Sequence, residues 1–452
     1  MKTLPQVTNR APLKSTDELS RIMQDVLTRA RTHGATDASV AVNHDSGFSV
    51  DVRMREVETV AFSEDRGVGV TVYIGSRKGS ASSSDTSPAA LDAMVAAAVD
   101  IAGVSASDPC FGLPDSALMS SQHAELDLFH PWVITPPEAI EMALKCEAHA
   151  LGLDQRISNS DGVNVSTYTF CHGFANTYGF EGIVQSSRHS MSCSLIATDG
   201  DKMQRDDDYT TARNAQHLQA WDALAASAVK RATSRLNAKQ LKTKKMPVLF
   251  SSRLSSGLIG SFIGAISGSN LYRKHSFLMD SIGQQVFPTG IRIHEQPRLL
   301  GALGSSPFDS EGVPTRDNVF VDDGRVCQYI LGSYSARKMG LATTANSGGV
   351  FNLTVDPTAG DLAALLKQMG TGLLVTELMG DGANGLTGDY SRGASGFWVE
   401  AGEIQYPVEG ITVAGNLKDM FRRIAAIGHD VNPNYSTRCG SILIDEMMVA
   451  GD

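Results

Sequence analysis

The sequence predicts an α+β protein with two or three domains, and three observations lead to this prediction. First, the chain has 452 residues, whereas a single hydrophobic core stops growing near about 250 to 300 residues. Second, hydrophobic residues make up 42% and charged residues 19% of the chain, which are ordinary values for globular proteins. Third, the 43 glycines accompany short alternating stretches, and this favours strands and tight turns over a helical bundle.

Residues 15–104 are expected to form a first domain, and two helices frame it. A capping box begins the first helix at Ser15, because the serine hydroxyl and the glutamate three residues later can each cap a free backbone N–H group. Hydrophobic residues then recur at helical spacing as far as Gly34. The second helix begins at Pro88, since serine before it caps a helix start and proline suits the first turn. This helix is expected to end at Gly103.

Between the two helices, alternating polar and apolar residues predict an antiparallel meander. Turns are expected at the sequences Asp-Ser-Gly, Met-Arg-Glu and Asp-Arg-Gly, which suit reversals of the chain. The expected strands comprise residues 38–43, 48–53, 57–62 and 68–74.

A linker and a middle domain are expected next. Residues 105–131 contain prolines and glycines without a clear period, which predicts a linker that packs along the surface. Residues 132–236 are expected to form a middle α+β domain that begins with a helix capped by Thr135. Two alternating runs between residues 163 and 198 flank an Asn-Thr-Tyr-Gly sequence and predict a long hairpin. A helix over residues 218–236 completes this domain.

Residues 246–452 are expected to form the largest domain, which is rich in β-strands and has few helices. Its short strands follow one another too closely for βαβ crossovers, which need a dozen or more linking residues. Helical spacing predicts helices at residues 254–267, 362–369 and 417–427.

Charge and cysteine usage exclude several classes of protein. The formal net charge is −10 and lysine and arginine do not cluster, so no nucleic-acid groove is expected. Six widely spaced cysteines include no Cys-x-x-Cys pair, which fits a reducing compartment. Residues 1–20 lack the apolar core of a signal peptide, and no window reaches the ~18 apolar residues of a membrane span. We therefore expect a cytoplasmic protein that binds neither nucleic acid nor membrane.

Two places in the sequence invite a search for a metal site. His294 and Glu295 resemble the beginning of a zincin helix, but no second histidine follows and Pro297 would break the helix. The other group lies on the expected hairpin and comprises Cys171, His172, His189 and Cys193. Neighbouring strand residues face opposite sides of a sheet, and residues four apart are separated by ~13 Å. Ordinary sheet residues are therefore the preferred interpretation, with a zinc site or a cysteine nucleophile as alternatives.

One acidic segment resembles a calcium-binding loop. The triplet 206–208 consists of three aspartates, yet it lacks the alternate-residue spacing and the terminal glutamate of an EF-hand loop. We interpret it as a solvated loop without a bound ion.

Several longer sequence segments resemble those of the TldD/PmbA family of metalloproteases. In the last third of the chain they are FDSEGVPT from Phe308, GSYSARKMG from Gly332, ELMG from Glu377, TGDYSRGASGFWVE from Thr387 and GNLKDM from Gly415. Near the start of the chain, EVETV from Glu56 and RKGSA from Arg77 are similar to the same family. The resemblance covers nearly the whole chain, so a chance match is implausible.

Within this family, the TldD type of subunit has a His-Glu-x-x-x-His helix and a distant cysteine as metal ligands, and this chain departs from that pattern. In the helix that resembles it, Ser261 and Phe262 stand in place of the first His-Glu pair and Ile266 stands in place of the second histidine. None of these side chains supplies an imidazole or a carboxylate. Cys439 lies near the position of the cysteine ligand. The chain thus resembles the PmbA type of subunit, and we expect no catalytic, metal-binding or cofactor-binding residue in it.

The resemblance implies hydrolysis of unfolded or extended peptides inside a closed chamber that two unlike subunits form. Zinc is then expected in a TldD-like partner, where the metal activates water and a glutamate acts as general base. This chain would enclose and position the peptide, and a strand edge in its β-rich C-terminal domain could accept the peptide as an added strand. The implied substrates are peptide precursors, such as the leader of a bacterial peptide antibiotic, and disordered antitoxins.

Two other interpretations stay open at this point. The chain could be a non-catalytic peptide-binding or regulatory homodimer. It could also be an autonomous hydrolase with an unrecognised site, for which the cysteines and histidines of the hairpin are the candidates.

Overall fold

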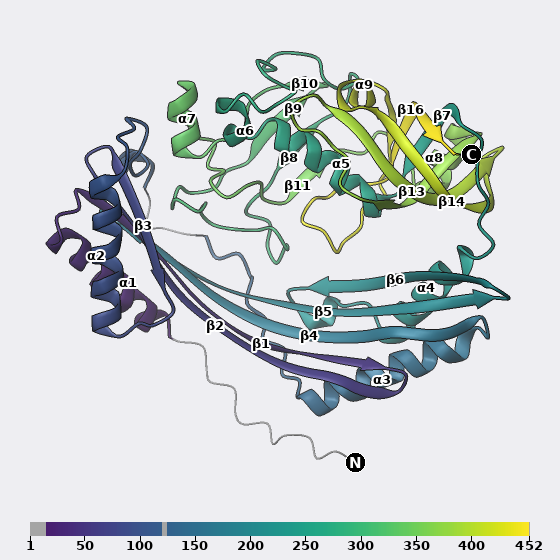
Figure 1. Ribbon diagram of the computed structural model, residues 1–452, viewed down its shortest axis with the longest axis horizontal. Helices are drawn as coiled ribbons and strands as arrows, with labels where there is room; N and C mark the ends of the chain where they lie inside the picture. Colours follow the sequence, from purple (N-terminus) through teal and green to yellow (C-terminus); the bar gives the residue numbers. More distant parts are fainter. Residues whose placement is uncertain (1–14, 120–123, 452) are drawn as a thin grey trace.

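The computed structural model describes residues 15–119 and 124–451 and shows an α+β fold (Figure 1). Expectations for residues 1–14 fall outside the described part of the chain. A long, curved sheet forms the lower half of Figure 1, and the C-terminal domain covers its concave face. Between residues 15 and 451, wherever the structure describes the chain, no helix is long and apolar enough to cross a membrane.

The curved sheet is antiparallel and has the strand order β3-β2-β1-β4-β5-β6. Because β1 pairs with β4, the sheet continues from the first expected domain into the middle one. The expected hairpin is confirmed as the β4–β5 pair. The strands are β1 (Asp37–Arg53), β2 (Glu56–Ile74), β3 (Arg77–Ser83), β4 (Ile157–Asn176), β5 (Glu181–Asp199) and β6 (Lys202–Ala212).

Two of the expected turns in the meander are wrong, because β1 and β2 each run without interruption. The glycines that suggested turns mark close contacts within the sheet instead. A Cβ atom on Gly47 would lie 2.2 Å from the ring of Tyr168, and one on Gly67 would lie 2.5 Å from the side-chain oxygen of Asn43. Glycine is therefore needed for space at position 47, where a Cβ atom would also lie 2.3 Å from the backbone oxygen of Thr167. At position 67 the neighbour is the end of a side chain, and neither glycine reverses the chain.

The third expected turn is confirmed at Met54 and Arg55, between β1 and β2. Both residues have left-handed backbone conformations, with φ of 51° and 65°, as a two-residue hairpin turn of the primed kind requires. The buried carboxylate of Glu147 accepts hydrogen bonds from both backbone N–H groups, at 2.9 and 2.6 Å. Glu147 lies on the helix at residues 136–153, and its carboxylate thus holds the end of the β1–β2 hairpin against that helix.

Four helices cover the convex face of the curved sheet, and all four confirm expected helices. The capping interactions follow the sequence signals: Ser15 accepts a hydrogen bond from the backbone of Glu18, and Thr135 forms a complete capping box. The two helices of the first expected domain pack on one hydrophobic cluster, and the two helices of the middle domain pack on another, at the other end of the sheet. The helices are α1 (Thr16–Thr32), α2 (Pro88–Val104), α3 (Pro136–Leu153) and α4 (Trp221–Ser234).

The C-terminal domain is built on a second sheet, with the order β14-β13-β12-β7-β16-β15. Because β14 also pairs with β16, the sheet closes on itself and leaves no long free edge there among the described residues. In the described part of the chain, residues 56–67 of β2 pair with no strand on the side away from β1. The strands are β7 (Lys244–Phe250), β12 (Gly372–Met379), β13 (Asp389–Glu400), β14 (Glu403–Asn416), β15 (Ile424–Ile427) and β16 (Ile442–Ala450).

The two faces of this closed sheet pack against different helices, as alternating side chains require. Val248 and Phe250 lie in the cluster that contains α5 (Ser252–Ala265), whereas Leu249 packs against α8 (Leu362–Met369). Both helices were expected. The third expected helix is correct only at its start, because α9 (Leu417–Arg422) gives way to strand β15.

Four further short elements with strand pairing and two short helices complete the domain. The strands form a small sheet of order β10-β9-β8-β11. The sequence periodicity did not predict the two helices. The six elements are α6 (Gly268–Tyr272), β8 (Ile293–Glu295), β9 (Asn318–Asp322), β10 (Arg325–Val326), α7 (Ser333–Met339) and β11 (Leu353–Val355).

The linker between the first two expected domains packs on the C-terminal domain, as far as residues 105–119 show. The guanidinium of Arg337 on α7 donates hydrogen bonds to the backbone carbonyls of Cys110, Gly112 and Leu113. Lys338 forms an ion pair with Asp108 at 2.7 Å. Helix α7 thus fixes this segment beside the curved sheet.

The interpretation of residues 206–208 as a solvated loop is wrong, since the three aspartates lie in strand β6. Asp206, with a side chain only 9% exposed, pairs with Arg231 at 2.8 Å and Arg235 at 3.4 Å. The two following aspartates pair with Arg253 on α5, both at 3.2 Å. The triplet therefore joins the curved sheet to the C-terminal domain.

Candidate functional site

Helix α5 carries the three positions at which the family pattern would place metal ligands. Phe262 is fully buried, and its ring centroid lies 4.9 Å from that of Phe287 and 6.0 Å from that of Phe421. Ile266 is also fully buried, at the end of the helix. Ser261 is partly exposed, and its hydroxyl donates to the carbonyl of Gly257 at 3.3 Å. Phe262 and Ile266 therefore serve packing, and the Ser261 hydroxyl bonds to the backbone within its own helix.

Cys439 lies near the same helix but is buried away from solvent. The hydroxyl of Ser255 on α5 donates to its backbone carbonyl at 3.1 Å. Burial raises the pKa of the Cys439 thiol to about 12, so the thiolate that a metal would need is disfavoured at neutral pH. Within residues 15–119 and 124–451, no group of three or more His, Cys, Asp or Glu side chains could hold a metal ion.

The four hairpin residues do not converge on one point. Cys171 packs under α1 and α2, whereas Cys193 packs under α3 and α4. His189 is buried between a threonine hydroxyl at 2.9 Å and a backbone carbonyl at 2.8 Å. His172 faces the concave side and contacts Asp45 at 2.9 Å. Alternation along the strands separates these side chains, as their spacing indicated.

The His294–Glu295 pair lies on strand β8 and not on a helix. The buried carboxylate of Glu295 accepts hydrogen bonds from the side chains of Asn318 and Asn346, at 2.7 and 2.8 Å. His294 contacts Asp356 at 3.0 Å. Both side chains thus stabilise local structure around the small sheet.

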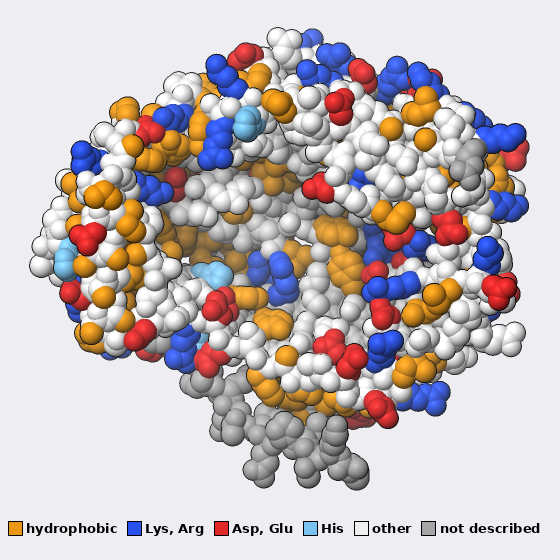
Figure 2. Space-filling view, in the orientation of Figure 1, with side chains coloured by type: hydrophobic (Ala, Val, Ile, Leu, Met, Phe, Trp, Pro, Cys, Tyr) orange, Lys and Arg blue, Asp and Glu red, His pale blue; other side chains and the backbone are white. Residues whose placement is uncertain are grey.

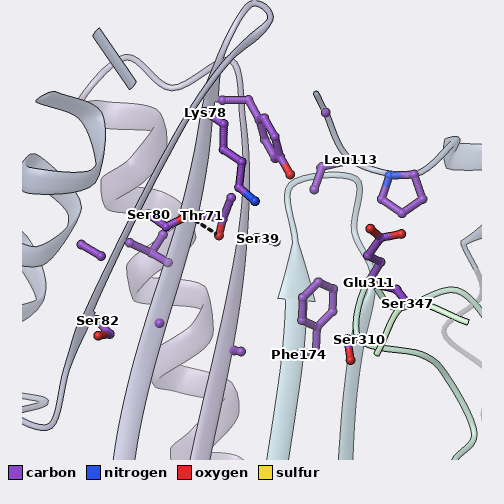
Figure 3. Close-up of a pocket in the computed structure, with 17 residues that line it drawn as sticks. Ser39, Thr71, Lys78, Ser80, Ser82, Leu113, Phe174, Ser310, Glu311 and Ser347 are labelled. Atoms are coloured by element: carbon purple, nitrogen blue, oxygen red, sulfur yellow. Dashed lines mark hydrogen bonds between the residues drawn. The ribbon is translucent and has the colours of Figure 1, made fainter. Parts of the chain in front are cut away.

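A cleft lies between the concave face of the curved sheet and loops of the C-terminal domain, and it is visible as a hollow in Figure 2. It consists of two cavities of about 530 and 390 Å³. Small and polar side chains line most of the first cavity (Figure 3). The two cavities adjoin each other, because both are lined by Ala41, Phe174, Ser310 and Ser347.

Arg213 lies at the wall of the second cavity without a carboxylate partner among the described residues. Its guanidinium donates to the backbone carbonyls of Ala302 and Leu303, both at 2.8 Å. Burial lowers the pKa of Arg213 to about 10, so the group stays charged at neutral pH. The second cavity therefore has a positively charged wall that backbone contacts hold in place.

Asp309 is a buried carboxyl group at the wall of the second cavity. It accepts hydrogen bonds from the backbone N–H groups of Glu311, Val313 and Ser347, at 2.9 to 3.0 Å. Burial raises the pKa of Asp309 to about 7, and the carboxylate of Glu311 acts in the same direction. The N–H donors oppose this change but do not cancel it.

The raised pKa of Asp309 predicts a pH-dependent stability. The folded chain binds a proton here between about pH 4 and pH 7 that the unfolded chain releases, so this group loses stabilising effect as pH rises through that window. Relative to Asp309→Asn, the free energy of unfolding should fall by up to about 1.4 kcal/mol per pH unit between these limits. Urea unfolding of both proteins at pH 5, 6, 7 and 8 measures the difference. Parallel profiles would contradict the prediction.

Comparison with known proteins gives matches along almost the entire chain. Sequence profiles of the PmbA/TldA metallopeptidases match as domain 1 at residues 38–102, as the central domain at residues 129–236 and as the C-terminal domain at residues 243–451. The chain is 47% identical to Metalloprotease PmbA of Escherichia coli O157:H7, over 92% of each protein. It is 43% identical to a Metalloprotease PmbA homolog of Haemophilus influenzae, over 99% of this chain and 100% of the other.

Solved structures agree over the same extent. A crystal structure from Bacteroides thetaiotaomicron, of a protein named as a candidate modulator of DNA gyrase, has a TM-score of 0.91 and 26% identity, and covers 97% of this chain and 100% of the other. TldE from Thermococcus kodakarensis has a TM-score of 0.82 and 19% identity over 95% of this chain and 100% of the other, and thus shares the fold.

Proposed function

The chain belongs to the PmbA/TldD metallopeptidase family as a PmbA-type member, and from this premise we propose that it is the subunit without a zinc site in a two-component metalloprotease. The proposed complex cleaves unfolded or extended peptides, such as peptide precursors and disordered antitoxins, in the cytoplasm. Zinc is held by a TldD-type partner, and this chain encloses and positions the substrate. A Metalloprotease TldD homolog of Haemophilus influenzae is 27% identical over 45% of this chain, which supports a paralogous partner.

The proposal rests on one observation: apolar side chains occupy positions at which the family pattern has metal ligands. Phe262 and Ile266 are fully buried and apolar, and Phe262 belongs to an aromatic cluster with Phe287 and Phe421. Zinc needs imidazole, thiolate or carboxylate ligands, and the neighbouring thiol of Cys439 has its pKa raised by burial. The catalytic ligands must then come from another subunit.

The cleft supports a role in holding an extended substrate. Its walls carry hydroxyl groups and backbone more than bulky side chains, which suits contact with a main chain of varied sequence. In the C-terminal domain, β16 covers the edge of β14 at residues 412–414, so in this proposal the cleft and the edge of β2 add to the strand edge as surfaces that bind the peptide.

Cleavage of an unstructured peptide tests the proposal directly. The purified chain and a TldD-type partner are assayed separately and mixed, each with and without a metal chelator. Cleavage is expected only in the mixture, and the chelator should abolish it because the bound metal activates water. Replacing the first histidine of the partner's metal-binding helix should have the same effect as the chelator, while the corresponding change Ser261→Ala in this chain should leave cleavage intact.

The other outcomes favour the competing functions. Cleavage by this chain alone would contradict the proposal and point to an autonomous hydrolase. Peptide binding without cleavage in any mixture would instead favour a regulatory peptide-binding protein.

A further inference from the structure

The larger cavity of the cleft carries charges of opposite sign on facing walls. One wall belongs to the curved sheet and bears Lys78 on β3, and the other belongs to the C-terminal domain and bears Glu311 (Figure 3). The cavity measures about 530 Å³, which is within the range of sites for small ligands. Leu113 and Pro114 of the linker contribute to its lining.

Glu311 is held in place by the backbone, yet part of its carboxylate is available. Oε2 accepts a hydrogen bond from the N–H group of Ser333 at 2.9 Å. Oε1 accepts no hydrogen bond from the described residues, and Figure 3 shows the carboxylate beside the cavity. Partial burial raises the pKa of the half-buried Tyr73 phenol to about 12, and the nearby negative charge of Glu311 acts in the same direction. The site therefore has a fixed negative charge in a partly desolvated position.

Lys78 presents the opposite charge from the sheet. Its side chain extends toward the cavity in Figure 3, and no carboxylate of the described residues lies within ion-pair distance of its ammonium group. The hydroxyls around it are already engaged in part, since Thr71 and Ser80 bond to each other at 2.9 Å. Lys78 and Glu311 form no ion pair with each other or with any other residue that the structure describes, so the two charges face an open space.

We propose that this cavity binds the end of a substrate peptide that carries one ammonium group and one carboxylate group within a few residues, with the ammonium at Glu311 and the carboxylate at Lys78. The inference rests on the proposed function for the identity of the ligand as a peptide. Opposite charges on facing walls are satisfied together only by a ligand with both signs, and a singly charged peptide leaves one wall unpaired. The rest of the peptide continues into the second cavity through the residues that both share.

This arrangement gives the complex a preference for particular peptide ends while the main-chain contacts elsewhere stay tolerant of sequence. The ammonium group can come from the peptide's amino terminus or from a lysine. The carboxylate can come from the carboxyl terminus or from an acidic side chain. The chemistry is the same in each case, and the choice of peptides in the experiment separates the sources.

Direct binding to the purified full-length chain tests the proposal without requiring cleavage. Fluorescence anisotropy measures the affinity of an unstructured peptide that carries a central dye, a free amino terminus and an acidic second residue. Glu311→Gln and Lys78→Met are each expected to weaken binding about three- to fivefold, as removal of one partly exposed ion pair does. Glu311→Gln keeps an acceptor for Ser333. Lys230→Met is the matched control that should bind like the unaltered chain, because this exposed lysine lies on α4 and lines neither cavity.

Modified peptides identify which group each residue binds. Acetylation of the amino terminus should weaken binding to the unaltered chain and abolish the effect of Glu311→Gln. If Lys78 binds the acidic side chain, replacement of that residue by its amide should abolish the effect of Lys78→Met. If Lys78 binds the terminal carboxylate, amidation of the carboxyl terminus should abolish it. A lysine side chain is the second source of the ammonium group. If Glu311 binds it, replacement of lysine in a lysine-containing peptide should abolish the effect of Glu311→Gln.

Equal affinity of both variants and the unaltered chain for every peptide would overturn the proposal. So would a loss of binding that does not depend on the peptide's charges, because that result indicates a structural role for the two residues. Failure of the proposed function is a different result: charge-dependent binding would persist, but the mixture with a TldD-type partner would cleave nothing.

Discussion

Phe262→Ala is expected to lower the free energy of unfolding by about 3–5 kcal/mol, the range found when a buried phenylalanine is truncated. The side chain is fully buried, and its ring packs edge-on against Phe287 and Phe421. Those two rings also contact each other, with centroids 5.0 Å apart. Truncation therefore leaves a cavity inside a cluster whose other members cannot all move into it. Urea unfolding followed by near-ultraviolet circular dichroism, which reports on packed aromatic rings, measures the change.

Ser261→Ala is the matched control for this prediction, since it alters the neighbouring position of the same helix. Ser261 is partly exposed and its hydroxyl bonds only to the backbone of its own helix, so the change should stay within about 0.5 kcal/mol. A cost below about 1 kcal/mol for Phe262→Ala would show that the ring does not stabilise the domain. The interpretation of this position as a structural replacement for a ligand would then lose its main support.

The local parts of the fold could be predicted from the sequence because their causes lie within a few residues. Ser15, Pro88 and Thr135 begin helices where capping chemistry places them. Residues 176–180 reverse the β4–β5 hairpin for a similar reason, as Asn176 accepts hydrogen bonds from two backbone N–H groups of the turn. In each case the interaction that determines the structure joins neighbours in the sequence.

Features that depend on distant partners could not be predicted in this way. Gly47 resembles a turn residue until the ring of Tyr168 is placed beside it. The chain after Arg422 has helical spacing, yet Ile424 pairs with Ile444 and becomes part of a strand. The closure of the C-terminal sheet likewise depends on contacts between β14 and β16, for which the sequence carries no local signal.

The same distinction between local and distant causes applies to the candidate site. The loss of ligands at Ser261, Phe262 and Ile266 could be read from residue types, because none of them supplies a zinc-binding atom. The cleft could not, since Lys78 and Glu311 become neighbours only when the C-terminal domain covers the sheet. Absence of a counter-ion is a property of the folded arrangement, and an isolated lysine or glutamate in a sequence does not indicate it.

Asp206→Ala is expected to cost about 3–5 kcal/mol, the loss found when one partner of a buried ion pair is removed. Its side chain is 9% exposed and pairs with Arg231 at 2.8 Å and with Arg235 at 3.4 Å. Arg235 also contacts Glu377 of the C-terminal domain. Removing the carboxylate leaves two guanidinium groups close together with one counter-ion fewer. Because this network joins the curved sheet to the C-terminal domain, unfolding should also become less cooperative in a calorimetric scan.

Asp161→Ala provides the control, because this carboxylate pairs at 2.7 Å with Arg205, whose side chain is 67% exposed. Solvent screens such a pair, so its removal should cost at most about 1 kcal/mol. Equal costs for the two substitutions would contradict the assignment of Asp206 to a buried network. A large cost for Asp206→Ala with one cooperative transition would locate its contribution between the curved sheet and α4, which carries Arg231 and ends at Arg235. The contacts of Arg253 with the two following aspartates would then be what joins the domains.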